Sequence, residues 1–220
     1  TKAMLFDSSA NVVSRVSIEH KQYYPQPGWV EHDPVEILHN TYAAIEYLLK
    51  EVGKDKNEIE SISITNQRET VVVWDKVSGK PVYNAIVWQC NRGAAYCDRL
   101  IAEGKETFVK EKTGLIINPY FSASGVKWVL DHIEHSNINK ENILIGTIDS
   151  WLIWNFTKGK VHATDYTNAS RTLLFNIHTL NWDNELLNLF SVKRSMLPEV
   201  FPCDSIFGTT TLNGLSTEIP

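Results

Sequence analysis

A group of hydrogen-bonding side chains follows a β-like segment in the first third of the chain. Residues 59–65 alternate along the segment and are rich in β-branched types, which predicts a strand that continues through Ile64. The polar run that follows comprises Asn66, Gln67, Arg68, Glu69 and Thr70. Arg68 offers a rigid fork of donors, and Glu69 only accepts when it is ionised. Because adjacent strand residues point to opposite faces, both can reach one ligand only if the backbone turns there.

These residue types suit a small polyhydroxy ligand. Each hydroxyl both donates and accepts, so it can use Arg68 and Glu69 together, and the nearby indole of Trp88 can cover the carbon chain. Ligands of open α/β sheets bind just beyond strand ends, where this run is expected. An adjacent Arg–Glu pair is more often a solvated surface pair, so the dipeptide alone does not decide between the two interpretations.

The elements that must position this group alternate between strands and helices. Strands are expected at 3–6, 11–20, 59–64 and 71–74, and Asp33 is expected to cap a helix that starts at Pro34, has Glu36 as a capping-box partner and continues to Val52. Further helices are predicted at 92–103, 106–112, 124–134, 150–156 and 184–190, and 206–220 is predicted to be a hairpin or connecting loop that does not belong to the core. The order predicts a mixed α/β fold.

Composition excludes several classes of protein. The 220 residues, with 43% hydrophobic and 21% charged content, are ordinary for a globular chain of one large or two small domains. A net charge of −5 argues against a general nucleic-acid or anionic-membrane binder. No apolar run reaches the roughly 20 residues of a membrane span, no signal peptide is seen, and Cys90, Cys97 and Cys203 lack CxxC spacing. Free thiols, together with the lack of a membrane span and of a signal peptide, favour a cytoplasmic location for the protein.

Familiar phosphate and metal motifs are absent. The sequence has neither GxxxxGK[ST] nor GxGxxG. His132 and His135 have a spacing that could hold a transition metal, but a solvated helix face is the better interpretation, so no metal site is predicted. Ser170 and Arg171 lack the GxSxG context of a nucleophile, and a structural role is favoured for them. Asp149 is interpreted as a helix cap.

Longer strings carry a resemblance to a known family. ITNQRET and YNAIVWQ are accompanied by GWVEHDP, TGLIINPYFSAS, GTIDSWLIW and TDYTNASRTLLFNIHTLNWD. Across nearly its whole length the chain resembles glycerol kinases of the FGGY carbohydrate-kinase family. The resemblance implies a ribonuclease-H-like, actin-like ATPase domain with a mixed sheet and flanking helices. It also implies that 1–220 is the N-terminal, substrate-side domain, which lacks the start of the phosphate hairpin, and that the C-terminal nucleotide-binding domain is absent.

The resemblance also assigns roles to residues. Arg68 and Glu69 would hydrogen-bond the glycerol hydroxyls, Tyr120 would add a phenolic contact, and Trp88 would pack on the carbon backbone. Judged without the family, Tyr120 and Trp88 would be interpreted as core or loop aromatics. Lys2 falls where the family's phosphate hairpin usually has Arg, and it could touch a nucleotide phosphate.

The catalytic base is expected beyond Pro220, so no catalytic residue is assigned in this chain and the isolated chain is expected to be inactive. The implied reaction is ATP-dependent phosphorylation of glycerol to sn-glycerol 3-phosphate, with Mg²⁺, in an enzyme that forms dimers or tetramers. Its partners would be glycerol and ATP, the latter held by the missing domain, with no nucleic acid and no membrane. A kinase for another polyol or sugar, and a non-catalytic ligand-binding module, remain alternatives. Gly125 departs from the family pattern, which usually has Lys there.

Overall fold

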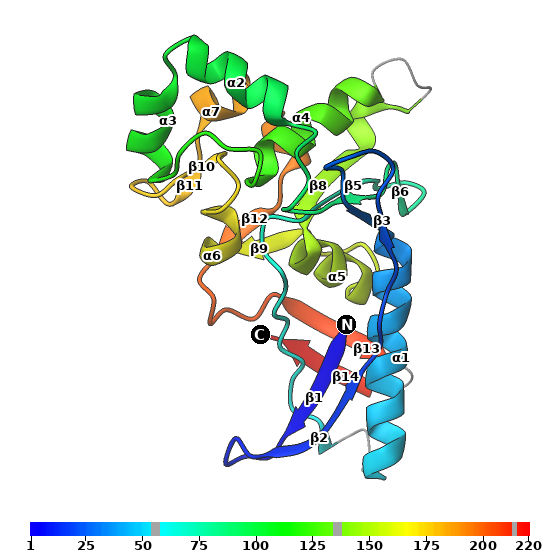
Figure 1. Ribbon diagram of the computed structural model, residues 1–220. Helices are drawn as coiled ribbons and strands as arrows, with labels where there is room; N and C mark the ends of the chain where they lie inside the picture. The colour runs from blue at the N-terminus through cyan, green and yellow to red at the C-terminus, as the bar shows by residue number, and fades with distance from the viewer. Residues whose placement is uncertain (54–57, 134–137, 213–214) are drawn as a thin grey trace.

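Helices and short strands form two connected regions of one α/β assembly (Figure 1). The computed structural model describes residues 1–53, 58–133, 138–212 and 215–220. The helices are α1 (Pro34–Val52), α2 (Ala94–Ala102), α3 (Glu106–Thr113), α4 (Ser122–His132), α5 (Ile148–Phe156), α6 (Tyr166–Ala169) and α7 (Asn184–Leu189). The strands are β1 (Lys2–Phe6), β2 (Val12–Ser17), β3 (Gln22–Tyr23), β4 (Glu31–His32), β5 (Val71–Asp75), β6 (Lys80–Pro81), β7 (Ala85–Ile86), β8 (Ile143–Thr147), β9 (Ala163–Asp165), β10 (Phe175–Asn176), β11 (Asn181–Trp182), β12 (Glu199–Phe201), β13 (Gly208–Leu212) and β14 (Leu215–Ile219).

The largest sheet is organised around β5. Its strands run in the order β3-β4-β7-β5-β6, and β8 also pairs with β5, in a register that joins Val71 to Thr147 and Asp75 to Ile143. All described pairings in this sheet are antiparallel, whereas β9 and β12 pair in parallel. Parallel and antiparallel pairing therefore both occur, and the predicted mixed α/β class is confirmed.

Side chains from β5 enter two hydrophobic cores because successive residues of a strand point to opposite faces. Val71 and Val73 pack in the core that includes α2, α4 and α7. Val72 and Trp74 pack in the core that includes α1 and α5. All four are almost fully buried, and burying a side chain of this size typically stabilises the fold by about 1.5–3 kcal/mol.

Helix α1 begins and ends as the sequence predicts, with one change. Asp33 Oδ1 accepts a hydrogen bond from the Val35 N–H at 2.8 Å, and Gly53 closes the helix in the left-handed conformation. The carboxylate of Glu36 accepts from the Lys21 N–H at 3.1 Å, so it binds a neighbouring segment instead of completing the expected capping box.

Two other local predictions are wrong. Residues 59–65 do not form the expected strand. Their one β-bridge among the described residues joins Ser61 to Glu218, and the Thr217 hydroxyl of β14 donates to the carbonyls of Ile59 and Glu60. Asp149 does not cap α5; the helix begins at Ile148 and its N-cap is Thr147.

The predicted helices match the structure, whereas many of the short strands are not predicted. The other expected helices are present with ends shifted by a few residues, and the end of the predicted 124–134 helix lies partly outside the described residues. Helix α6 and the strands β3, β4, β6 and β8–β12 are not among the predicted elements. Strands β13 and β14 pair antiparallel, as expected for a hairpin in the tail. The expectation that the tail does not belong to the core is wrong, because Ile219 of β14 is fully buried in the core that includes α1 and α5.

Candidate polyol site

The polar run ends in a turn immediately before β5. Glu69 has a φ of 68°, which is unusual for a residue with a side chain and confirms that the backbone turns here. The turn separates the two charged side chains: Glu69 is only 5% exposed, whereas Arg68 is exposed and makes no hydrogen bond or ion pair with a described residue. Ser122 Oγ, at the start of α4, donates to the Glu69 carbonyl at 2.9 Å and holds the turn against that helix.

The Glu69 carboxylate is paired with an arginine from a distant part of the chain. Arg171, just after α6, donates from Nε to Glu69 Oε1 at 2.7 Å. Its guanidinium lies 4.9 Å from the Phe121 ring centroid and 5.7 Å from that of Tyr120, distances at which cation–π contacts occur. From its sequence context Arg171 is expected to have only a structural role, and no local signal links it to a residue 102 positions away.

Two half-buried aromatic rings lie beside this pair. The ring centroids of Trp88, which follows β7, and Tyr120, which precedes α4, are 5.2 Å apart with an interplanar angle of 57°. Three of the predicted residues, Glu69, Trp88 and Tyr120, are thus joined in one cluster through Arg171. Such a cluster offers a carboxylate acceptor beside apolar ring surface, which suits the hydroxyls and carbons of a polyol.

The loop that carries Trp88 is anchored at both ends by one buried carboxylate. Glu31 Oε2 accepts from Asn84 Nδ2 at 2.8 Å, and Glu31 Oε1 pairs with Arg92 Nη2 at 2.6 Å. The Arg92 side chain is fully buried, and its guanidinium lies 4.1 Å from the Trp29 ring centroid. The ion pair therefore fixes where the segment that bears Trp88 begins and ends.

Asp149 connects the polar run to the sheet. Its carboxylate accepts from Asn66 Nδ2 at 3.2 Å and Thr164 Oγ1 at 2.7 Å, and also from the Thr147 hydroxyl. Burial raises the pKa of this carboxyl to about 6 even though these hydrogen bonds oppose the shift. Asn66 lies two residues before Arg68, so this contact fixes the approach to the turn.

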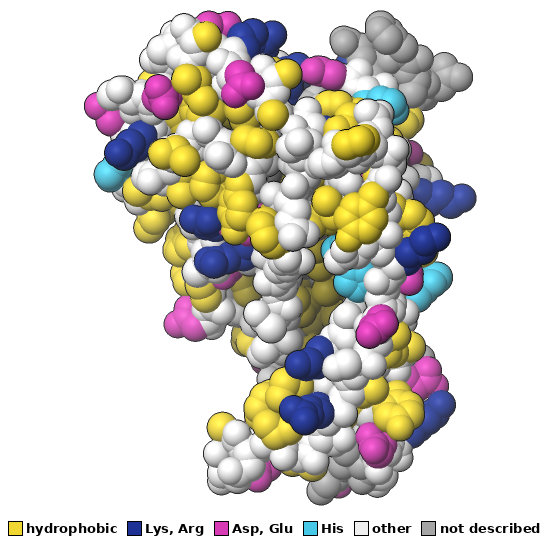
Figure 2. Space-filling view, viewed as in Figure 1, with side chains coloured by type: hydrophobic (Ala, Val, Ile, Leu, Met, Phe, Trp, Pro, Cys, Tyr) yellow, Lys and Arg dark blue, Asp and Glu magenta, His cyan; other side chains and the backbone are white. Residues whose placement is uncertain are grey.

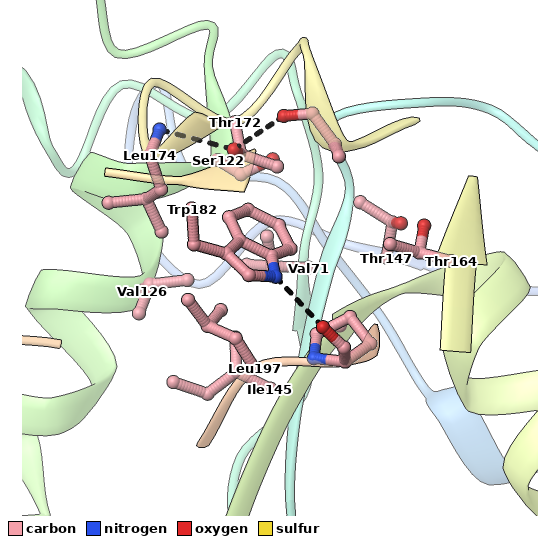
Figure 3. Close-up of a pocket in the computed structure, with 13 residues that line it drawn as sticks. Val71, Ser122, Val126, Ile145, Thr147, Thr164, Thr172, Leu174, Trp182 and Leu197 are labelled. Atoms are coloured by element: carbon pink, nitrogen blue, oxygen red, sulfur yellow. Dashed lines mark hydrogen bonds between the residues drawn. The ribbon is translucent and has the colours of Figure 1, made fainter. Parts of the chain in front are cut away.

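A small cavity lined by residues of this region is too small to hold a polyol. It measures about 20 Å³, and its walls include Val71, Thr147, Thr164 and Trp182 (Figure 3). Trp182 Nε1 donates to the Pro198 carbonyl at 2.8 Å across the lower part of that view. The space is about the size of one water molecule, so we interpret it as a packing void.

Both ends of the chain lie apart from the cluster. Lys2 is an exposed residue of β1, and its side chain makes no contact with Glu69, Trp88 or Tyr120. Pro220 directly follows β14 and is the last residue of the chain. The catalytic base expected beyond Pro220 is therefore not among the residues of this structure, and its position stays a prediction.

Gly125 lies within α4, where the helix packs closely on the sheet. A Cβ at this position would lie 3.2 Å from Ile86 Cγ2 and 3.6 Å from Val71 Cγ2. The departure from the family pattern at Gly125 therefore affects how α4 packs on β5 and β7.

The surface charges, the possible metal ligands and the helix lengths add three observations. On the face in Figure 2, basic and acidic side chains are interspersed. No group of three or more His, Cys, Asp or Glu side chains suited to a metal ion occurs among the described residues. In the same residues, no helix has the length and apolar character needed to cross a bilayer.

Comparison with known proteins places this geometry in a family. Residues 1–219 match the N-terminal domain of the FGGY family of carbohydrate kinases. The chain is 54% identical to glycerol kinase 1 of Thermotoga maritima and 50% identical to a glycerol kinase of Shewanella baltica, in both cases over all of this chain and 45% of the relative. It thus spans less than half the length of these relatives.

Solved structures show the same fold. The glycerol kinase of Plasmodium falciparum with ADP superposes with a TM-score of 0.90 at 39% identity, over 99% of this chain and 45% of that one. A ligand-bound xylulose kinase from Lactobacillus acidophilus has a TM-score of 0.88 at 22% identity, over 99% of this chain and 44% of that one, and shows the fold alone.

Proposed function

The chain belongs to the FGGY family of carbohydrate kinases, and we propose that it supplies the polyol half-site of a kinase that phosphorylates glycerol with ATP. The observation that carries the proposal is the nearly buried Glu69 carboxylate beside the half-buried rings of Tyr120 and Trp88. The predominance of glycerol kinases among relatives near 50% identity supports glycerol as the substrate.

In this proposal the chain's residues bind and orient the substrate. Glu69 accepts a hydrogen bond from one hydroxyl, and Arg68 donates from the exposed side of the same turn. Tyr120 adds a phenolic hydrogen bond, and Trp88 covers the carbon backbone. Phosphoryl transfer depends mainly on positioning and charge stabilisation, so a fixed polyol contributes directly to the rate. The product would be sn-glycerol 3-phosphate.

The remaining chemistry is proposed to come from other residues of the full-length protein. A base beyond Pro220 would accept the proton of the attacking hydroxyl, and ATP with Mg²⁺ would be bound chiefly by residues outside this chain. Mg²⁺ would neutralise charge on the transferred phosphoryl group. Lys2 remains a candidate phosphate contact, because it is an exposed cation near the chain's start.

We also propose a cytoplasmic protein that forms homo-oligomers when full length. The free cysteines Cys90, Cys97 and Cys203 are compatible with a reducing compartment.

The test is steady-state kinetics of the full-length protein with ATP, Mg²⁺ and glycerol. Arg68→Ala and Glu69→Ala should each raise the glycerol KM about 10–100-fold, because each removes a partner from a polar site. Arg99→Ala, in an exposed Arg99–Glu103 pair with an N–O separation of 3.8 Å, is the matched control and should change little. Unchanged KM values in both site variants would refute the assignment.

A panel of polyols and sugars decides between glycerol and the alternatives. Faster phosphorylation of a larger polyol or sugar would identify a different kinase. Binding of glycerol without phosphorylation of any member would identify a ligand-binding module.

A further inference from the structure

We propose that Arg171 is a positioning residue of the polyol site, which holds one oxygen of the Glu69 carboxylate so that the other is presented to a substrate hydroxyl. This inference rests on the proposed function, because it assumes that Glu69 contacts the polyol. It assigns a role to a residue that the sequence motifs left as structural.

The two oxygens of the carboxylate have different surroundings. Oε1 accepts the charge-assisted hydrogen bond from Arg171 Nε at 2.7 Å. Oε2 has no hydrogen-bond partner among the described residues. It is also not one of the fully buried side-chain oxygen atoms without a partner in that part of the chain, so it retains some exposure to solvent. One oxygen is therefore anchored, and the other remains accessible as an acceptor.

Glu69 has no other side-chain anchor among the described residues. Its backbone is held by Ser122 Oγ on the carbonyl, but the carboxylate ends a flexible side chain that makes no further hydrogen bond within the described ranges. Without Arg171 the carboxylate would be free to change rotamer, and a charge on a residue only 5% exposed would lose its one ionic partner in this part of the chain. Substrate would then have to order it on binding, at a cost in affinity.

Arg171 is itself held by the aromatic wall of the site. Its guanidinium lies 4.9 Å from the Phe121 centroid and 5.7 Å from that of Tyr120. Tyr120 in turn packs on Trp88. The arginine thus sets the carboxylate relative to the rings that would cover the carbon chain.

This pair differs from an ordinary surface ion pair. Its side chains are 29% and 5% exposed, whereas those of Arg99 and Glu103 are 59% and 50% exposed. Exposed pairs contribute little because water and salt screen them, whereas screening is weaker for the mostly buried Glu69. Lysine would be a poor replacement, since it lacks the planar group that rests on the rings.

The test is a double-mutant cycle in the full-length protein, with glycerol KM and kcat measured for wild type, Arg171→Met, Glu69→Gln and the double variant. Arg171→Met should raise the glycerol KM about 10-fold or more with a smaller change in the KM for ATP. In the Glu69→Gln background the same substitution should change the glycerol KM by about twofold at most, because the carboxylate that Arg171 positions is already absent. Arg171→Lys should retain part of the function, and Arg99→Met should resemble wild type.

Independent effects would overturn the proposal. If the fold-changes in glycerol KM caused by the two substitutions multiply in the double variant, Arg171 is only structural. The same conclusion follows if Arg171→Met lowers the unfolding temperature but leaves the glycerol KM unchanged. If Arg171→Met does not fold, the cycle is built on Arg171→Lys, whose effect should likewise vanish beside Glu69→Gln. If wild type phosphorylates a different polyol, the glycerol assignment fails, while the same cycle run on that polyol still decides the role of Arg171.

Discussion

Replacing Asp149 by Asn should remove a pH-dependent loss of stability. Asp149 is buried, with only 5% of its surface exposed, and burial is the chief reason that its pKa is raised from 3.8 to about 6. At about 1.4 kcal/mol per pH unit, this difference is equivalent to about 3 kcal/mol. The folded protein binds this proton more tightly than the unfolded chain does. The stabilising contribution is therefore fully present below pH 3.8 and is lost as pH rises toward about 6.

The asparagine variant has no such titration, so the comparison isolates one group from all the other carboxylates. Urea unfolding of both proteins gives the free energy of unfolding at each pH. The value for wild type minus that for Asp149→Asn should fall by about 2.5 kcal/mol between about pH 4 and pH 7. The absolute difference also contains the hydrogen bonds to Asn66, Thr147 and Thr164 that asparagine alters. In wild type the Thr147 and Thr164 bonds favour the ionised carboxylate, and the pKa of about 6 already includes their effect.

The opposite trend would refute the reasoning. If wild type gains stability relative to the variant as pH rises, the three donors outweigh burial and hold Asp149 ionised in the folded protein. A difference that does not change with pH would mean that the carboxyl has nearly the same pKa folded and unfolded.

Three further substitutions test the supports of the site. Arg92→Met should lower the free energy of unfolding by about 3–5 kcal/mol, because it leaves Glu31, whose side chain is 4% exposed, without its ionic partner; a loss below about 1 kcal/mol in urea unfolding would contradict this. Gly93→Ala should cost about 1–3 kcal/mol, because its Cβ would overlap Ser124 Oγ, and an unchanged thermal midpoint would show that α4 yields easily. Tyr120→Phe should raise the glycerol KM of the full-length protein several-fold. It should not lower stability, since the phenol has no hydrogen-bond partner among the described residues. Equal KM values for wild type and variant would show that the hydroxyl does not contact glycerol.

The sequence determined features that depend on neighbouring residues. The cap of Asp33 on α1 and the strand at 71–74 depend on residues a few positions apart, and both are predicted from the sequence. The turn at Glu69 could be inferred because two adjacent side chains cannot otherwise share a ligand. The family resemblance pointed to Trp88 and Tyr120, which do lie together.

Local patterns failed where a distant partner decides the outcome. Residues 59–65 alternate as a strand does, but a strand needs a neighbour that continues the backbone hydrogen bonding, and the segment's one β-bridge among the described residues joins Ser61 to Glu218. Asp149 has the sequence context of a cap, yet its partner Asn66 is 83 residues away and draws the carboxylate inward.

Only the tertiary structure decided which cationic side chain forms an ion pair with Glu69. The adjacent Arg68 was the natural candidate from the sequence, but the turn directs it outward, and Arg171 takes its place from 102 residues away. Periodicity and capping come from short-range geometry and can be predicted from the chain. The pairing of buried charges depends on which segments the folded cores bring together, so only the tertiary structure reveals it.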